Sequence, residues 1–358
     1  MQLSTPIKSA MILYSVVLLI NCSTPKKEES NQSTIVEKTV NTAFNPSEGR
    51  IEILDSSCEN LIDKDAKIEI LSEGYTWTEG PVWVEDGGYL LFSDIPANAI
   101  WKWDPKNGIS LYLKPSGFTG SKERSGETGS NGLFVNNAGQ LLLCQHGDRR
   151  IAVMNADLAS PKADYSSISD NYEGKKLNSP NDLEVHSNGD IYFTDPPYGL
   201  EKNMEDPLKE LDFQGIFKWS STDNSTQLVF KDLSRPNGIA LSPDEKTAYA
   251  ANSDPSRAIY MAFDVNDDGS FSNERVFFDA TQMAKEEYPD LGMPDGMDVD
   301  KNGNIFATGP GGILIFSADE KLIGQIITGQ KTANCTIGSD GYLYMTSHSF
   351  LTRIKLKY

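Results

Sequence analysis

Six segments of this chain begin alike, and this repeat constrains the fold more than any other feature of the sequence. Each segment opens with an acidic or amide residue beside a small one and continues as an apolar run. We call the opening residues the lead residues. The six segments are Glu79-Gly80-Pro81-Val82-Trp83, Asn131-Gly132-Leu133-Phe134, Asn181-Asp182-Leu183-Glu184-Val185, Asn237-Gly238-Ile239-Ala240, Asp295-Gly296-Met297-Asp298-Val299 and Asn334-Cys335-Thr336-Ile337-Gly338.

The spacing of the lead residues predicts the blades of a β-propeller. The intervals are 52, 50, 56, 58 and 39 residues (79 to 131, 131 to 181, 181 to 237, 237 to 295 and 295 to 334), and a turn and a second apolar strand follow each segment. A period near 50 with several strands is typical of propeller blades. We therefore expect an all-β, six-bladed β-propeller over residues 51–358. A β-sandwich with similar turns is the alternative, which six matching units disfavour.

The last unit is short because the given sequence ends at Tyr358. We expect a strand over residues 67–71, N-terminal to the first blade, to complete this unit and close the ring.

The lead residues also predict a metal site. The innermost strand of each blade lines the central channel, so residues at corresponding ends point at one another. Glu79, Asn181, Asn237 and Asp295 would place two carboxylates and two amides together, and a hard divalent cation would compensate their charge. We expect Ca²⁺, with Zn²⁺, Mg²⁺ or Mn²⁺ as alternatives, although no histidine or cysteine is a lead residue. The competing interpretation is that these residues merely form turns.

The first 50 residues indicate export. Residues 1–21 combine Lys8 with an apolar run, as in a secretory signal peptide, and Cys22 follows at once. This stretch resembles a bacterial lipobox, so we expect a lipoprotein signal peptide and lipidation at Cys22. Asn21 departs from the usual Gly or Ala before the cysteine, and an ordinary signal peptide is the alternative. Residues 22–50 are polar and are expected to form a disordered tether.

The charge balance excludes one large class of partner. The chain has 51 acidic and 32 basic residues, a net charge of −19. Nucleic acid needs a basic surface, so no nucleic-acid partner is expected.

We expect a monomer in the bacterial cell envelope, facing the periplasm or the cell surface, that contacts the membrane only through its lipid anchor.

Longer motifs around the lead residues resemble the SMP-30/gluconolactonase/LRE-like family of six-bladed propellers. The matching stretches are Thr78-Glu79-Gly80-Pro81-Val82-Trp83, Cys144-Gln145-His146-Gly147-Asp148-Arg149-Arg150, Leu177-Asn178-Ser179-Pro180-Asn181-Asp182-Leu183, Tyr192-Phe193-Thr194-Asp195-Pro196-Pro197-Tyr198-Gly199, Arg235-Pro236-Asn237-Gly238-Ile239-Ala240-Leu241-Ser242-Pro243-Asp244, Pro294-Asp295-Gly296-Met297-Asp298 and Ala333-Asn334-Cys335-Thr336. They cover roughly residues 70 to 358 in the same order as in the family.

The resemblance implies a divalent metal, usually Ca²⁺, on Glu79, Asn181, Asn237 and Asp295. It also implies that Asp295 is the catalytic base or nucleophile, acting directly or on a water molecule activated at the cation. Asn131 would contact substrate or support the ligands.

Two further residues are substrate-binding candidates, each with a structural alternative. His146 lies in a strand-end motif beside two arginines, and it either binds substrate or bonds to the backbone. Tyr198 follows a Pro-Pro pair and either shapes the substrate mouth or fixes a turn.

The function that follows is metal-dependent hydrolysis of a small sugar lactone at the cell envelope, as in a gluconolactonase. One alternative is an enzyme of the same fold that cleaves phosphotriesters or aromatic lactones. Another is a non-catalytic propeller that binds an envelope partner. Retention of all four metal-ligand types weighs against the non-catalytic alternative.

Overall fold

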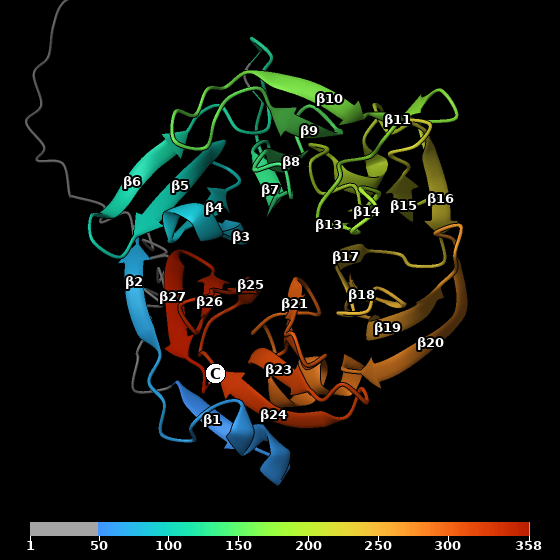
Figure 1. Ribbon diagram of the computed structural model, residues 1–358. Helices are drawn as coiled ribbons and strands as arrows, with labels where there is room; N and C mark the ends of the chain where they lie inside the picture. The colour runs from blue at the N-terminus through green and yellow to red at the C-terminus, as the bar shows by residue number, and fades with distance from the viewer. Residues whose placement is uncertain (1–48, 123, 358) are drawn as a thin grey trace, which may run out of the picture. The chain divides into compact units, whose positions relative to one another are not determined.

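Six antiparallel sheets follow one another along the chain and are arranged as a ring around a central axis (Figure 1). The computed structural model describes residues 49–122 and 124–357. The predicted all-β six-bladed propeller is confirmed. The predicted signal peptide, Cys22 and all but the end of the predicted tether lie outside the described residues. The first strand, β1 (Arg50–Ile53), begins at the last residue assigned to the tether.

Each sheet is a blade whose first strand lies next to the central axis. The first three blades, from the inside outward, are β3 (Thr78–Val84), β4 (Tyr89–Asp94), β5 (Ala99–Asp104) and β6 (Gly108–Leu113); β7 (Ser130–Val135), β8 (Leu141–Gln145), β9 (Arg150–Met154) and β10 (Tyr165–Ser169); and β13 (Leu183–Val185), β14 (Ile191–Asp195), β15 (Gly215–Trp219) and β16 (Thr226–Phe230).

The last three blades repeat this order. They are β17 (Pro236–Leu241), β18 (Thr247–Asp254), β19 (Arg257–Val265) and β20 (Phe271–Asp279); β21 (Met297–Val299), β22 (Ile305–Gly309), β23 (Gly312–Phe316) and β24 (Leu322–Ile327); and β25 (Thr332–Ile337), β26 (Tyr342–Ser347) and β27 (Phe350–Lys355), which is completed from the N-terminal side.

The ring closes through the strand that precedes the first blade. β2 (Glu69–Glu73) pairs antiparallel with β27, placing Glu69 opposite Arg353 and Glu73 opposite Phe350. The predicted closing strand over residues 67–71 is therefore confirmed, although it lies two residues further along the chain. The sequence did not predict that β1 would add a fifth strand to the fifth blade, where Arg50 pairs with Ile327.

Short elements fill the connections. They are the hairpin of β11 (Asn171–Tyr172) and β12 (Lys175–Lys176), three 3₁₀ turns, η2 (Ser56–Asn60), η3 (Glu85–Gly87) and η4 (Asn203–Glu205), and the π-helical turn η5 (Met283–Glu287). Among the described residues, no helix is both long and apolar enough to cross a membrane.

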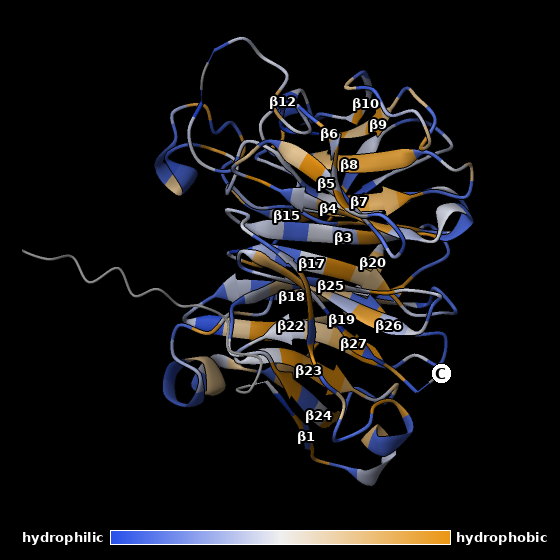
Figure 2. Cartoon of the chain, turned by 90° about the vertical axis from the view of Figure 1, so that its left-hand side faces the viewer, coloured by the Kyte–Doolittle hydropathy of each residue, from blue (hydrophilic) through white to orange (hydrophobic). Residues whose placement is uncertain are grey.

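Apolar strands pack blade against blade. All five residues of β8 are buried, and Figure 2 shows most of the apolar colour in strands and most of the polar colour in loops. Between the last two blades, Phe306 and Ile313 pack with Leu343 and Met345. Each fully buried side chain of this size stabilises the fold by roughly 1.5–3 kcal/mol relative to its exposed state. The ring is therefore a rigid support for side chains at its centre.

Neighbouring innermost strands touch through their backbones around the central axis. Gly132 donates its N–H to the Asn181 carbonyl at 2.8 Å, and Gly296 donates to the Ala333 carbonyl at 2.8 Å. A Cβ on Gly238 would lie 2.2 Å from the Asp295 carbonyl oxygen. The glycine that follows a lead residue thus allows the backbones of neighbouring blades to approach closely, because it has no Cβ.

Hydroxyl groups of the second strands hold these contacts. Ser93 donates to the Asn131 carbonyl at 2.9 Å, and Thr194 donates to the Asn237 carbonyl at 2.6 Å. Thr308 lies 2.9 Å from the Ala333 carbonyl and 3.0 Å from the Gly296 carbonyl. Because buried carbonyls need donors, these hydroxyls fix the backbone that carries the lead residues.

Candidate active site

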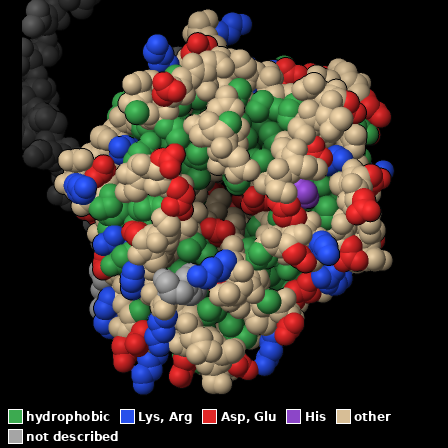
Figure 3. All heavy atoms as spheres, in the orientation of Figure 1, with side chains coloured by type: hydrophobic (Ala, Val, Ile, Leu, Met, Phe, Trp, Pro, Cys, Tyr) green, Lys and Arg blue, Asp and Glu red, His purple; other side chains and the backbone are tan. Residues whose placement is uncertain are grey.

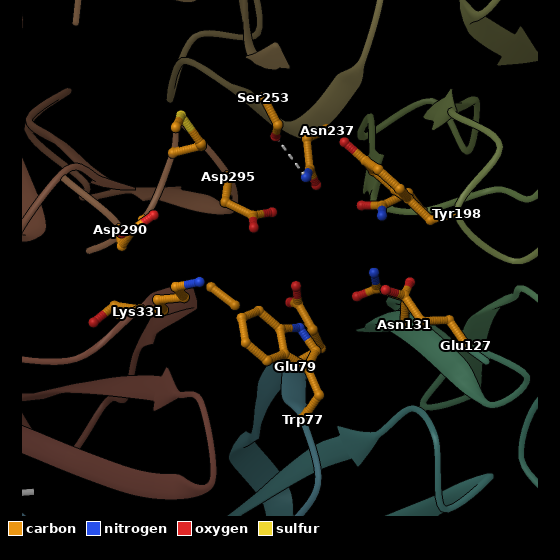
Figure 4. Close-up of a pocket in the computed structure, with 15 residues that line it drawn as sticks. Trp77, Glu79, Glu127, Asn131, Tyr198, Asn237, Ser253, Asp290, Asp295 and Lys331 are labelled. Atoms are coloured by element: carbon orange, nitrogen blue, oxygen red, sulfur yellow. Dashed lines mark hydrogen bonds between the residues drawn. The ribbon is translucent and has the colours of Figure 1, made fainter. Parts of the chain in front are cut away.

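A cavity of about 260 Å³ opens where the innermost strands begin (Figure 4). Side chains from all six blades and their connections surround it. They are Trp77, Glu79, Glu127, Asn131, Asn181, Tyr198, Asn237, Ser253, Asp290, Gly292, Met293, Asp295, Lys331, Thr332 and Ala333. This volume is close to the lower end of the range for small-molecule pockets. We call this cavity the mouth pocket.

The four predicted metal ligands all line the mouth pocket. Glu79 is the second residue of β3, Asn237 is the second residue of β17, and Asn181 and Asp295 precede β13 and β21 by two residues. The structure therefore brings the four together, as the repeat predicted. Their role as metal ligands stays a prediction.

Local hydrogen bonds orient Asn237. Its amide nitrogen donates to the Ser253 hydroxyl at 2.8 Å, and that hydroxyl donates to the Pro294 carbonyl at 2.6 Å. Because the amide nitrogen donates to Ser253, the amide oxygen of Asn237 is left to face the mouth pocket, where it can act as a ligand or an acceptor. Pro294 directly precedes Asp295, so the hydrogen bond from Ser253 to the Pro294 carbonyl also fixes the backbone that carries Asp295.

The two lead carboxylates are buried close together. Burial raises the pKa of Glu79 to about 8, and the charges of Asp182 and Glu127 add to this rise. Burial, followed by the charge of Glu79, holds the pKa of Asp295 well above its usual range. Ionising both carboxylates in this buried position is costly. Either a nearby cation compensates their charge, or at least one of them stays protonated.

Unpaired oxygens in the mouth pocket fit a hard cation. Asp295 Oδ1 and Asn131 Oδ1 are buried and have no hydrogen-bond partner among the described residues. Carboxylate and amide oxygens are the ligands that Ca²⁺ accepts. In the described ranges, no three His, Cys, Asp or Glu side chains form a metal cluster, so a cation bound here would depend on amide oxygens as well as carboxylates.

Comparison with known proteins places this site in a family. A family model described as the SMP-30/gluconolactonase/LRE-like region matches residues 77–349. The chain is also 38% identical over 317 residues to a gluconolactonase from Zymomonas mobilis subsp. mobilis, with 86% of each chain covered. The chain belongs to the SMP-30/gluconolactonase/LRE-like family. The resemblance found in the sequence is thereby confirmed.

Further proteins resemble this chain in sequence or in structure. A gluconolactonase from Xanthomonas campestris has a TM-score of 0.72 at 28% identity, covering 86% of this chain and 95% of that one. A regucalcin from Xenopus laevis is 27% identical over 292 residues, covering 78% of this chain and 86% of the relative. A structure of a calcium-binding regucalcin from Agrobacterium tumefaciens, at 18% identity and a TM-score of 0.61, shares the propeller.

The predicted substrate-binding residues occupy different positions. Asn131 and Tyr198 line the mouth pocket. His146 lies behind the pocket wall: its side chain is fully buried, and its Nδ1 is 3.4 Å from Glu127 Oε2. As a substrate-binding residue, His146 stays a prediction, and in this geometry it would act through Glu127.

Several pocket residues were not predicted from the sequence. Trp77, Glu127, Ser253, Asp290 and Lys331 line the mouth pocket, but none of them opens a repeat segment. Trp77 precedes β3 and contacts the His348 ring edge-on, with centroids 5.3 Å apart. The only signal for Glu127 was its position four residues before Asn131, which is too weak to single it out.

A second cavity, of about 340 Å³, lies where the innermost strands end. Its carboxylates include Asp182, Glu184 and Asp298. Burial raises the pKa of Asp182 to about 7 and that of Glu184 to about 8. Acidic side chains surround the hollow at the centre of the ring in Figure 3. Carboxylates thus line the cavities at both ends of the innermost strands.

Proposed function

We propose that this protein hydrolyses sugar lactones in the mouth pocket, with a divalent cation, most simply Ca²⁺, held by Glu79, Asn181, Asn237 and Asp295. Family membership and 38% identity to a gluconolactonase support lactone hydrolysis. The observation that carries the proposal is the convergence of two buried carboxylates and two amides from four blades in one pocket. Nothing else in a propeller scaffold requires this convergence, whose charge is costly to bury.

The bound cation would supply a positive charge that stabilises the developing oxyanion of the lactone carbonyl. Asp295 is placed to accept the proton of the attacking water as its oxygen bonds to the carbonyl carbon. The bond from that carbon to the ring oxygen then breaks, and the ring oxygen takes up a proton to give a hydroxy acid. Asn237 and Ser253 hold Asp295 in position through the Pro294 carbonyl.

We further propose that the protein works at the bacterial cell envelope, facing the periplasm or the cell surface. The support is the sequence alone: a signal-like segment over residues 1–21 followed by Cys22. Metabolic labelling with a fatty acid should mark the wild-type protein, whereas Cys22→Ser should stay unlabelled. Equal labelling of the two proteins would contradict lipidation at Cys22.

A substrate panel tests the activity. Hydrolysis of glucono-1,5-lactone, dihydrocoumarin and a phosphotriester would be followed with a pH indicator above the spontaneous rate. We expect turnover of the sugar lactone and its loss in EDTA. Turnover of the phosphotriester or the aromatic lactone alone would contradict a sugar lactonase, and no turnover of any compound would contradict an enzyme of this class.

A further inference from the structure

Glu127 is a carboxylate of the mouth pocket that belongs to no repeat segment. It lies in the connection between β6 and β7, and its side chain is 37% exposed. Glu127 and Asp295 lie on opposite sides of the pocket in Figure 4. The charge of Glu127 nevertheless acts on both Glu79 and Asp295. Its carboxylate therefore faces the space that a substrate would fill.

The connection that carries Glu127 is fixed at several points. Asn98 Oδ1 accepts the backbone N–H groups of Gly117 at 2.8 Å and Ser116 at 3.0 Å. Arg124 donates to the Gly147 carbonyl at 2.6 Å and to the Gly199 carbonyl at 2.8 Å. These bonds attach the connection to the first three blades. Glu127 is thus held in place before any substrate arrives, which lowers the entropy lost on binding.

His146 lies directly behind Glu127. Both of its ring nitrogens are buried without a hydrogen bond in the described part of the chain, and Nδ1 is 3.4 Å from Glu127 Oε2. A buried imidazole without partners is costly, and a small rotation of the Glu127 side chain would bring this pair into hydrogen-bond range. With that hydrogen bond formed, Glu127 would fix the Nδ1–H tautomer, and His146 would in turn orient the carboxylate.

The acceptor capacity that Glu127 has left over indicates that the ligand carries a hydrogen-bond donor. An ionised carboxylate accepts hydrogen bonds and donates none. Among the described residues, the imidazole of His146 is the one donor close to the Glu127 carboxylate, so the rest of its acceptor capacity is left for the pocket. In a lactone whose carbonyl lies toward Asp295, the ring carbons on the far side would carry the groups that reach Glu127.

We propose that Glu127 is a specificity-determining residue that accepts hydrogen bonds from ring hydroxyls of the lactone, with His146 as its positioning residue. This inference rests on the proposed lactonase function. It names the substrate class as polyhydroxylated, uncharged lactones. Lactones without hydroxyls gain nothing from Glu127, and the carboxylate repels a substituent that carries phosphate or carboxylate.

The test compares two lactones with the same six-membered ring, glucono-1,5-lactone and δ-valerolactone, which has no hydroxyls. In Glu127→Ala we expect KM for glucono-1,5-lactone to rise about tenfold or more, because a site built to hydrogen-bond a hydroxyl loses its acceptor. The kcat for that lactone and both constants for δ-valerolactone should change less than about threefold. Glu127→Gln keeps one acceptor oxygen, so its KM for glucono-1,5-lactone should lie between those of the wild type and Glu127→Ala.

His146 has its own matched pair. His146→Ala should raise KM for glucono-1,5-lactone about three- to tenfold without a matching change for δ-valerolactone. His146→Asn keeps an N–H donor near the position of Nδ1 and should restore most of the loss. Glu286→Ala, which removes an exposed carboxylate outside the pocket, serves as the control and should match the wild type. Melting temperatures of all variants exclude loss of folding as the cause.

The outcomes separate this inference from the function beneath it. If wild-type protein hydrolyses neither lactone, the proposed function and this inference both fail. If the wild type is active but Glu127→Ala leaves the preference for glucono-1,5-lactone unchanged, or lowers both activities equally, only the role of Glu127 is overturned. A His146→Asn variant no better than His146→Ala would overturn the positioning role.

Discussion

Glu79 and Asp295 are the side chains on which the proposed chemistry depends most. Both are buried, and burial raises the pKa of Glu79 to about 8. Burial, followed by the charge of Glu79, holds the pKa of Asp295 well above its usual range. Near neutral pH the pair without a cation therefore holds at least one proton. A divalent cation must displace this proton before both carboxylates can bind it.

The first prediction is that cation binding releases protons. Because protons compete with the cation, Ca²⁺ affinity should rise as the pH rises from 6 toward 8. Calorimetric titration with Ca²⁺ at pH 7, in buffers of different ionisation enthalpy, should detect the release of about one proton per cation.

Glu79→Gln supplies the control for this prediction. The amide keeps an oxygen ligand but has no proton to release, so the variant should bind Ca²⁺ more weakly and with a smaller pH dependence. A wild-type affinity that is constant between pH 6 and 8 would contradict the account of the paired carboxylates.

At this scale the sequence predicted the residues that begin strands and missed those in connections. Glu79, Asn181, Asn237 and Asp295 could be identified because the repeat places each at the same end of an innermost strand. Glu127 and Trp77 reach the mouth pocket from connections, where length and path differ from blade to blade. No periodic pattern could reveal them.

The innermost strands position the pocket because neighbouring blades are bonded there. Thr194 in β14 donates to the Asn237 carbonyl at 2.6 Å and accepts the N–H of Asp182 at 3.2 Å. One hydroxyl therefore links the second strand of the third blade to the lead residue of the fourth.

The second prediction concerns this hydroxyl. Thr194→Val keeps the shape but leaves a buried carbonyl and a buried N–H without their partner. It should lower the free energy of unfolding by about 1–3 kcal/mol. Thr194→Ser keeps the hydroxyl and loses only a methyl group, which should cost about 1 kcal/mol. Urea unfolding measures both, and equal stability of the two variants would show that the hydroxyl is unimportant.

The inner strands of each blade could be predicted from sequence, whereas the outer ones could not. Apolar β8 is wholly buried, so it is conspicuous in the sequence. Outer strands such as β6 and β20 are largely exposed and mix polar with apolar residues. β1 was missed for the same reason, because it also mixes polar with apolar residues. It pairs with β24 at the edge of the fifth blade, and its Arg50 and Glu52 form an ion pair at the surface.

The whole ring depends on a strand from the opposite end of the chain. β2 covers the edge of β27, and residues between β1 and β2 add Cys58, Leu61 and Ile62 to the core of the last two blades. Without these segments the sixth blade would have three strands and an unpaired edge, which exposes backbone donors and acceptors. The N-terminal region therefore stabilises the site from a distance.

The third prediction tests ring closure by truncation. A chain that starts at residue 49 keeps β1 and β2 and should melt as the full-length protein does. A chain that starts at Tyr75 lacks both strands, and we expect it to lose its cooperative transition or to melt at least about 10 °C lower. Near-UV circular dichroism follows the transition, and a melting temperature unchanged in the shorter chain would contradict closure by β2.

The central claim is that residues from four blades form one cation-dependent lactonase site. The most direct test is the rate of glucono-1,5-lactone hydrolysis as Ca²⁺ is added back to EDTA-treated protein, measured for the wild type and for Asp295→Ala. The account predicts that Ca²⁺ restores the wild-type rate and leaves Asp295→Ala at the spontaneous rate. Full activity of the wild type in EDTA, or near-wild-type turnover by Asp295→Ala, would contradict it.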